Sequence, residues 1–91
     1  MFTTKDYQIL KAIIDRNDRK KGLSIGSGTT IKEIINKTNL SDKKIRETRD
    51  KFIKEGFIAE GLKNGKEKTY ILTEQGFKEL NKIRKNIFGE V

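Results

Sequence analysis

The densest group of side chains able to bind a partner follows Ser41. Within the next eight positions stand four cations, Lys43, Lys44, Arg46 and Arg49, and two carboxylates, Asp42 and Glu47. Ammonium and guanidinium groups donate hydrogen bonds to phosphates and to carbonyl or ring-nitrogen acceptors, and a guanidinium presents a planar fork of donors. This group therefore predicts recognition through charge and hydrogen bonds, not covalent chemistry.

Catalysis is not predicted. The sequence contains no His and no Cys, which removes the usual general base, the commonest metal ligand and any thiolate site. The carboxylates Glu33, Glu47, Asp50 and Glu60 each have a structural or ion-pair explanation. We therefore expect no enzymatic activity, no metal and no cofactor.

A glycine-rich stretch, Gly26-Ser27-Gly28, could suggest a phosphate-cradling loop. It lacks the rest of the dinucleotide fingerprint and the Gly-Lys-Ser/Thr ending of a P-loop. We therefore do not interpret it as a nucleotide site.

The charge balance indicates the class of partner. The 91 residues include 21 Lys and Arg against 13 Asp and Glu, giving a net charge of +8 and a pI of about 9.8. A folded basic surface gains affinity for nucleic acid by counterion release. No apolar run approaches the length of a membrane span and no signal peptide is recognisable, so we expect a cytoplasmic protein without a membrane partner.

The elements that must position the basic group begin before it. Apolar residues at helical spacing predict a first helix from Phe2 to about Ile14, capped by Thr3 or Thr4. The glycines between residues 18 and 29 predict a loop, in which Leu23-Ser24-Ile25 could form a short strand.

Two helices with a tight turn are predicted between Thr30 and Ile58. Thr30 and Glu33 have the spacing of a capping box, and Ser41 is a suitable N-cap for the second helix. Gly56 suits the C-terminal end of that helix. Four residues at helical spacing should face the core: Ile45, Thr48, Phe52 and Ile53.

A β-hairpin is predicted from Phe57 to Leu72, because Asn64-Gly65 favours a type I′ turn. A two-residue turn there sets Ile58 opposite Ile71 and Lys63 opposite Lys66. The tip would then carry Lys63, Lys66 and Lys68, an arrangement suited to a phosphate backbone.

A last helix should start after Thr73, with an apolar stripe along its length. Phe77 and Leu80 are expected to join a core supplied by Tyr7, Leu10, Ile14, Ile34, Ile45, Phe52, Ile58, Ile71 and Leu72. The rest of the stripe lies further along the helix, beyond the residues available to cover it. We therefore expect a homodimer through the two ends of the chain, formed by Phe2, Ile83, Ile87 and Phe88.

This order of elements resembles the winged helix-turn-helix family of small bacterial regulators, of the MarR and PadR kind. The resemblance covers about the whole chain and is carried by Leu40-Ser41, by the exit Phe52-Ile-Lys-Glu-Gly-Phe-Ile and by Tyr70-Ile-Leu-Thr-Glu-Gln-Gly. It implies an α+β fold in one domain over residues 1–91. Its parts are a helix-turn-helix at 30–56, a hairpin wing at 57–72 and a C-terminal helix at 73–89.

The resemblance also implies a function. In that family the third helix enters the major groove of double-stranded DNA, and the wing touches the neighbouring backbone or minor groove. Carried onto this chain, Lys43, Lys44, Arg46 and Glu47 are candidates for base contacts, and Ser41 for a phosphate. Arg49 is expected to meet a phosphate or Asp50. For each basic residue, a solvated side chain or an ion pair such as Arg46 with Asp50 is the alternative.

Three roles fit this reading. The first is a dimeric transcriptional regulator, such as a repressor. The second is a plasmid or phage partition adaptor of the TubR kind, which the chain resembles in size and fold and which would join repeated DNA sites to a filament. The third is a winged-helix module that binds another protein, which the basic third helix argues against.

Overall fold

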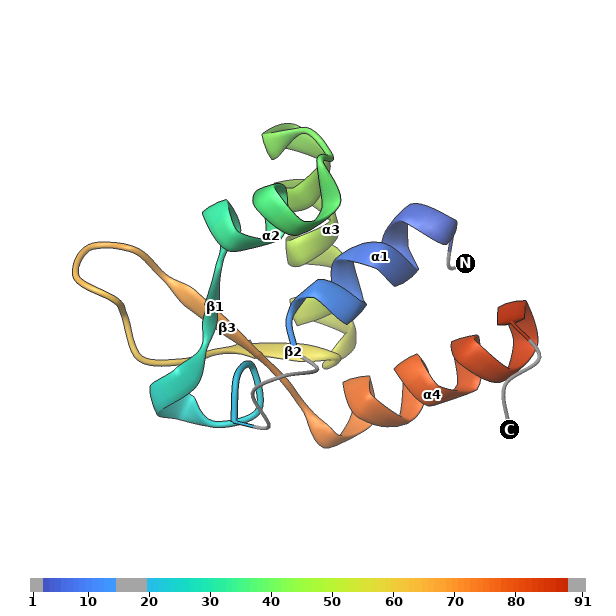
Figure 1. The fold of residues 1–91 in the computed structure, drawn as a ribbon. Helices are drawn as coiled ribbons and strands as arrows, with labels where there is room; N and C mark the ends of the chain where they lie inside the picture. Colours follow the sequence, from blue (N-terminus) through green and yellow to red (C-terminus); the bar gives the residue numbers. More distant parts are fainter. Residues whose placement is uncertain (1–2, 15–19, 89–91) are drawn as a thin grey trace.

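The computed structural model describes residues 3–14 and 20–88, with side chains up to Ile83. Four helices and a small antiparallel sheet follow one another in the chain (Figure 1). Their bounds are α1 Thr4–Ala12, the 3-10 turn η1 Ile25–Ser27, β1 Thr29–Thr30, α2 Ile31–Thr38, α3 Asp42–Glu55, β2 Ile58–Glu60, β3 Thr69–Leu72 and α4 Glu74–Phe88. This is the predicted α+β winged-helix fold.

The helix ends lie where their capping residues place them. Thr3 and Asp6 form a capping box at α1, and Thr30 and Glu33 form the predicted one at α2. Ser41 caps α3, and Gly56 ends it in the left-handed region with φ of 80°. These caps satisfy backbone groups that a helix end otherwise leaves without partners.

The sheet has the order β1-β3-β2, so β3 is its central strand. The first strand is not Leu23-Ser24-Ile25, as the sequence suggested. Leu23 and Ile25 are exposed, and the strand is Thr29–Thr30, which pairs with Tyr70 and Thr69. Both threonines are buried, and the Thr29 hydroxyl donates to the carbonyl of Ile13 at 2.6 Å.

The predicted hairpin register is wrong by one residue. Ile58 pairs with Leu72, not with Ile71, and Asn64 bridges Glu67, so that Gly65 and Lys66 are the central residues of the turn. Gly65 alone has positive φ there, at 65°, which matches a type II′ turn and not the predicted type I′. Lys63 therefore does not lie opposite Lys66.

The extra residue is accommodated between the turn and the paired strands. Three residues, 61–63, stand on the first arm against two, 68–69, on the second. The amide of Gly61 donates to the carbonyl of Thr69 at 2.9 Å, and the Thr69 hydroxyl donates to the carbonyl of Leu62 at 2.6 Å. Side-chain and backbone bonds thus replace the regular ladder at this bulge.

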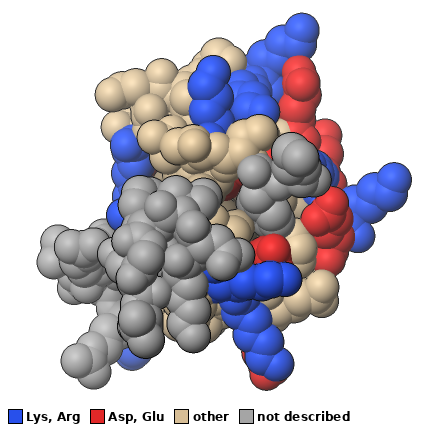
Figure 2. Space-filling model, turned by 90° about the vertical axis from the view of Figure 1, so that its right-hand side faces the viewer, with Lys and Arg blue, Asp and Glu red and all other residues tan. Residues whose placement is uncertain are grey.

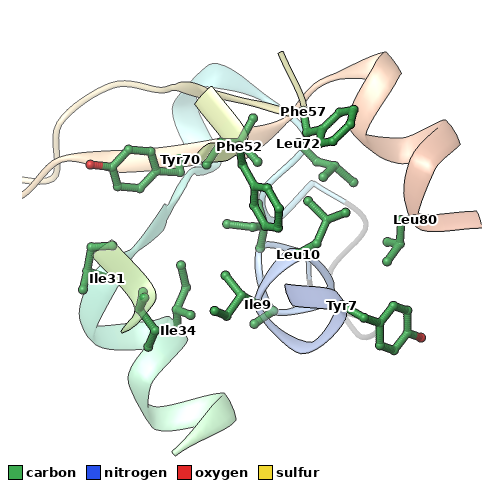
Figure 3. Close-up of a cluster of buried hydrophobic side chains, with 14 of the residues drawn as sticks. Tyr7, Ile9, Leu10, Ile31, Ile34, Phe52, Phe57, Tyr70, Leu72 and Leu80 are labelled. Atoms are coloured by element: carbon green, nitrogen blue, oxygen red, sulfur yellow. The ribbon is translucent and has the colours of Figure 1, made fainter. Parts of the chain in front are cut away.

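The core lies between the three N-terminal helices, the sheet and the start of α4 (Figure 3). The predicted core residues Tyr7, Leu10, Ile34, Ile45, Phe52, Ile58, Leu72 and Leu80 are all buried. Ile14 and Ile71 lie at its margin, half-buried. Ile13 is buried as well, on the same apolar face of the first helix, whereas the burial of Ile9 was not predicted.

Three predictions about buried positions are wrong. Phe77 and Ile53 were expected inside and are 43% and 39% exposed. Ile83 was expected at a subunit interface, yet it is 6% exposed and belongs to the core of the single chain. Ile83 reaches that core because α4 runs alongside α1 instead of projecting away from it (Figure 1).

Candidate nucleic-acid interface

The helix α3 is held by one narrow apolar face. Ile45, Thr48 and Phe52 are buried, at 0%, 3% and 0% exposure, and Ser41 accepts a hydrogen bond from the amide of Lys44 at 3.1 Å. Asn39, with φ of 58°, ends α2 and turns the chain sharply into α3. The rest of the α3 surface is thereby left to polar side chains.

Three of the predicted contact residues lie exposed on this outer surface: Lys43, Arg46 and Glu47. The Nε of Arg46 donates to both carboxylate oxygens of Asp42, at 3.0 and 2.9 Å, and not to Asp50. Both side chains are about half exposed, at 53% and 55%. A surface pair of this kind is worth little, so Arg46 can exchange Asp42 for another acceptor.

Lys44 lies elsewhere. Its ammonium is 3.7 Å from Oδ1 of Asp6, a carboxylate of α1 that is 3% exposed. Lys51, about two helical turns further along the same face of α3, donates to Oδ2 of the same carboxylate at 3.1 Å. Burial raises the pKa of Asp6, but the hydrogen bonds from Lys51 and from the Thr3 amide, with the two lysine charges, outweigh it and lower that pKa below its ordinary value.

Arg49 is also held inside the fold. Its guanidinium lies over the ring of Tyr70, 5.6 Å from the centroid, and one terminal nitrogen donates to the Tyr70 hydroxyl at 3.0 Å. Its Nε donates to Asp50 at 2.9 Å, which was one of the two expected partners. Burial lowers the pKa of Arg49, but the bonds to Asp50 and Tyr70 outweigh it and raise that pKa above its ordinary value.

The hairpin brings a second set of cations to the same side of the molecule. Lys63, Lys66 and Lys68 are exposed, as predicted, and Lys68 lies 3.5 Å from Glu60. Within the described chain, Lys63 and Lys66 form no ion pair. Lys32 of α2 reaches across to Glu67 at 3.0 Å.

A hollow of about 290 Å³ lies where α2, α3 and the hairpin meet. Four of its cations, Arg46, Arg49, Lys66 and Lys68, are among the predicted contact residues. Lys32 and Tyr70 were not predicted, because their position depends on how the hairpin packs against the helices. Its lining residues are Thr30, Ile31, Lys32, Arg46, Arg49, Lys66, Glu67, Lys68 and Tyr70. The lining therefore holds five cations and one carboxylate.

The opposite side of the molecule has a different character. Figure 2 shows the side where α1 begins and α4 ends, and there basic and acidic side chains are interspersed over the described surface. The predicted interface residues Phe2, Ile87 and Phe88 fall outside the part of the chain whose side chains the structure describes. No helix in the described ranges is long and apolar enough to cross a membrane.

No family model matches the chain, and no curated protein matches its sequence. Solved structures do. The DNA-binding TubR fragment from Clostridium botulinum has a TM-score of 0.66 and 26% identity, covering 91% of this chain and 99% of that one. AF1382 of Archaeoglobus fulgidus has a TM-score of 0.72 and 23% identity, covering 96% and 88%.

A third match is BpsR of Bordetella bronchiseptica, whose DNA binding is regulated by 6-hydroxynicotinic acid. It has a TM-score of 0.70 and 13% identity, covering 90% of this chain. This chain spans about half of that protein, 53% of its length. These matches agree on one architecture, the winged helix, and none of the three is named as an enzyme.

Proposed function

We propose that this winged-helix chain is a sequence-specific double-stranded DNA-binding protein that reads the major groove with α3 and acts as a dimeric transcriptional regulator. The observation that carries the proposal is the juxtaposition of the exposed polar face of α3 with the basic hairpin across one hollow. A reader helix and a backbone-contacting hairpin on one side of a domain suit a duplex.

In this proposal the residues of α3 have separate roles. Arg46, exposed near the N-terminus of α3, is the base reader, since an arginine can bond a guanine with two parallel hydrogen bonds. Ser41, Lys43 and Glu47 flank it on the side that faces the groove. Lys44 serves mainly to hold α3 against Asp6, and Lys63, Lys66 and Lys68 contact phosphates.

The experiment is a comparison of two duplexes over a salt series. One is selected from a random library by the wild-type protein, and the other has random sequence. Arg46→Ala should cost about 1–3 kcal/mol on the selected duplex, and much less on the random one. Lys54→Ala, which removes a charge from the last turn of α3, is the matched control and should leave discrimination unchanged. Equal losses on both duplexes for Arg46→Ala would remove its base-reading role.

A second candidate is DNA segregation. The DNA-binding TubR fragment matches this chain over 99% of its own length. Another matched TubR is described as a type III plasmid segregation protein. DNA fragments from the source genome that the protein captures should distinguish the roles. A site overlapping a promoter supports the regulator, whereas an array of repeated sites supports segregation.

A further inference from the structure

The hollow between α3 and the hairpin differs from a general basic surface in one respect: part of its floor is formed by packed, largely buried side chains. Tyr70 is 1% exposed and lines the hollow, and Figure 3 shows its hydroxyl pointing away from the apolar cluster. Arg49 packs over that ring and is 19% exposed. The other cations of the lining lie on exposed side chains.

Arg49 and Tyr70 keep hydrogen-bond donors that can serve a ligand in the hollow. The Nε of Arg49 donates to Asp50, and one terminal nitrogen donates to the Tyr70 hydroxyl. In the contacts that the structure describes, the other three of its five N–H groups have no acceptor. The Tyr70 oxygen accepts from Arg49, so its own proton remains available to an acceptor in the hollow. Asp50 is 70% exposed, so solvent and salt screen its charge and it competes only weakly with an anionic ligand for Arg49.

The rim of the hollow carries lysine ammonium groups on long, exposed side chains. Lys66 has no carboxylate partner among the described residues, and Lys68 lies 3.5 Å from the exposed Glu60. Glu67, the one carboxylate of the lining, is already paired with Lys32 at 3.0 Å. The hollow therefore offers a net positive site with fixed donors below and flexible ammonium groups above.

We propose that this hollow is a seat for one phosphodiester of the nucleic-acid backbone, with Arg49 and the Tyr70 hydroxyl as its fixed donors and Lys66 closing over it. The assignment rests on the proposed function, which places α3 and the hairpin against the same duplex. A phosphodiester suits the donors, because a planar guanidinium matches two phosphate oxygens and a hydroxyl can donate to one of them. Tyr70 is thus a positioning residue for Arg49 as well as a ligand.

The test uses the full chain and a random-sequence duplex over a salt series, with Tyr70→Phe and Arg49→Ala as variants. Tyr70→Phe keeps the ring in the core and removes only the hydroxyl. We expect it to weaken binding about tenfold at low salt, the size of one charge-assisted hydrogen bond. Arg49→Ala should lower the slope of log K against log salt by about 0.9, one phosphate's worth.

A matched control removes one positive charge far from the seat. Lys82→Ala, on the exposed side of α4, should leave the salt slope as in the wild type. Thermal unfolding of each variant checks that the fold is kept. If Tyr70→Phe proves unstable, Arg49→Lys replaces it, because it keeps the charge but loses the fork and should bind more weakly than wild type.

The outcomes separate the seat from the proposed function. If the wild type binds no duplex, the proposed function fails. If it binds, but Tyr70→Phe and Arg49→Ala bind equally well with an unchanged slope, only the seat is wrong. Inorganic phosphate titrated at constant ionic strength, with the Arg49 Nε–H followed by NMR, tests a free anion as the occupant. Shifts there with duplex binding unaffected in both variants would overturn the backbone assignment.

Discussion

Asp6 of α1 accepts a hydrogen bond from Lys51 of α3 at 3.1 Å, across 45 positions of sequence. Its other oxygen lies 3.7 Å from Lys44, and its side chain is 3% exposed. One carboxylate therefore joins the first turn of α1 to two lysines that lie about two turns apart on the helix that we propose reads DNA. The orientation of α3 depends on an interaction outside the helix-turn-helix itself.

Replacing this carboxylate should weaken the fold. Asp6→Asn retains the shape and an acceptor for the Thr3 amide but loses the charge that both lysines face, so we expect a loss of about 1.5–3 kcal/mol. Urea unfolding at pH 7 measures it. Asp42→Asn, which loosens only the exposed pair with Arg46, is the control and should cost less than about 1 kcal/mol. Equal losses for the two variants would contradict a special role for Asp6.

Stability should fall in acid, and the sign follows from two carboxylates. The pKa of Asp6 is lowered from its ordinary value of 3.8, and that of Glu33 from 4.5, so both bind protons less readily in the folded state. Their contribution is complete above the unfolded values and is lost as the pH falls through the folded ones. The free energy of unfolding should be nearly flat between pH 7 and 5.5 and should drop below about pH 4.5. The drop should be smaller in Asp6→Asn.

The turn of the hairpin requires a residue that tolerates positive φ. Gly65 has φ of 65°, and a β-branched side chain there is strained. Gly65→Val should remove hydrogen-exchange protection from the amides of Asn64 and Glu67, while the helices keep theirs. Gly26→Val is the control, because no atom lies within 4 Å of the added Cβ and φ is ordinary. Protection retained in Gly65→Val would contradict the observed turn.

At Gly76, in the first turn of α4, replacement by alanine should destabilise the protein, although alanine is normally the better helix former. A Cβ at Gly76 would meet the carbonyl of Phe57, so α4 could not start as close to the hairpin as it does. Gly76→Ala should destabilise the protein by about 1–3 kcal/mol although alanine favours helices. Asn81→Ala, exposed on the same helix, should instead stabilise it by a few tenths of a kcal/mol, about the difference in helix propensity. Thermal unfolding of both variants checks the two signs.

Dimerisation through the chain ends stays a prediction. Because Ile83 belongs to the core, the stripe that remains for an interface is Phe2, Ile87 and Phe88. Ile87→Asp combined with Phe88→Asp should sediment as a folded monomer with much weaker operator binding. Asn81→Asp with Lys82→Asp, on the exposed side of α4, should stay dimeric. A dimer in the first variant would place the interface elsewhere, and α3 or its neighbours would be the next candidate.

The parts of the fold that could be predicted are those fixed within a few residues. Thr30 with Glu33, Ser41 and Gly56 mark helix ends because a cap acts on backbone groups one turn away. The amphipathic spacing of α1 and α3 likewise placed Tyr7, Leu10, Ile45 and Phe52 in the core. These signals need no knowledge of the rest of the chain.

What could not be predicted depends on distant partners. The strand Thr29–Thr30 exists only because β3 lies beside it, and two residues carry too little pattern to reveal it. The observed register differs from the predicted one because the first arm of the hairpin holds one extra residue, at the place where the Thr69 hydroxyl donates to the carbonyl of Leu62. The contact of Arg49 with Tyr70 follows from that packing, so the floor of the candidate site was not visible in the sequence.

The central place of β3 in the sheet has a mechanical consequence. The strand pairs with β2 of the hairpin on one side and with β1, directly before α2, on the other. The amide of Leu62 also donates to the carbonyl of Ile25 at 2.9 Å. These hydrogen bonds tie the base of the hairpin to the segments that lead into α2, so the base cannot shift without disturbing them. In the function proposed above, α3 and the base of the hairpin therefore meet the duplex as one unit, without a prior rearrangement of one relative to the other.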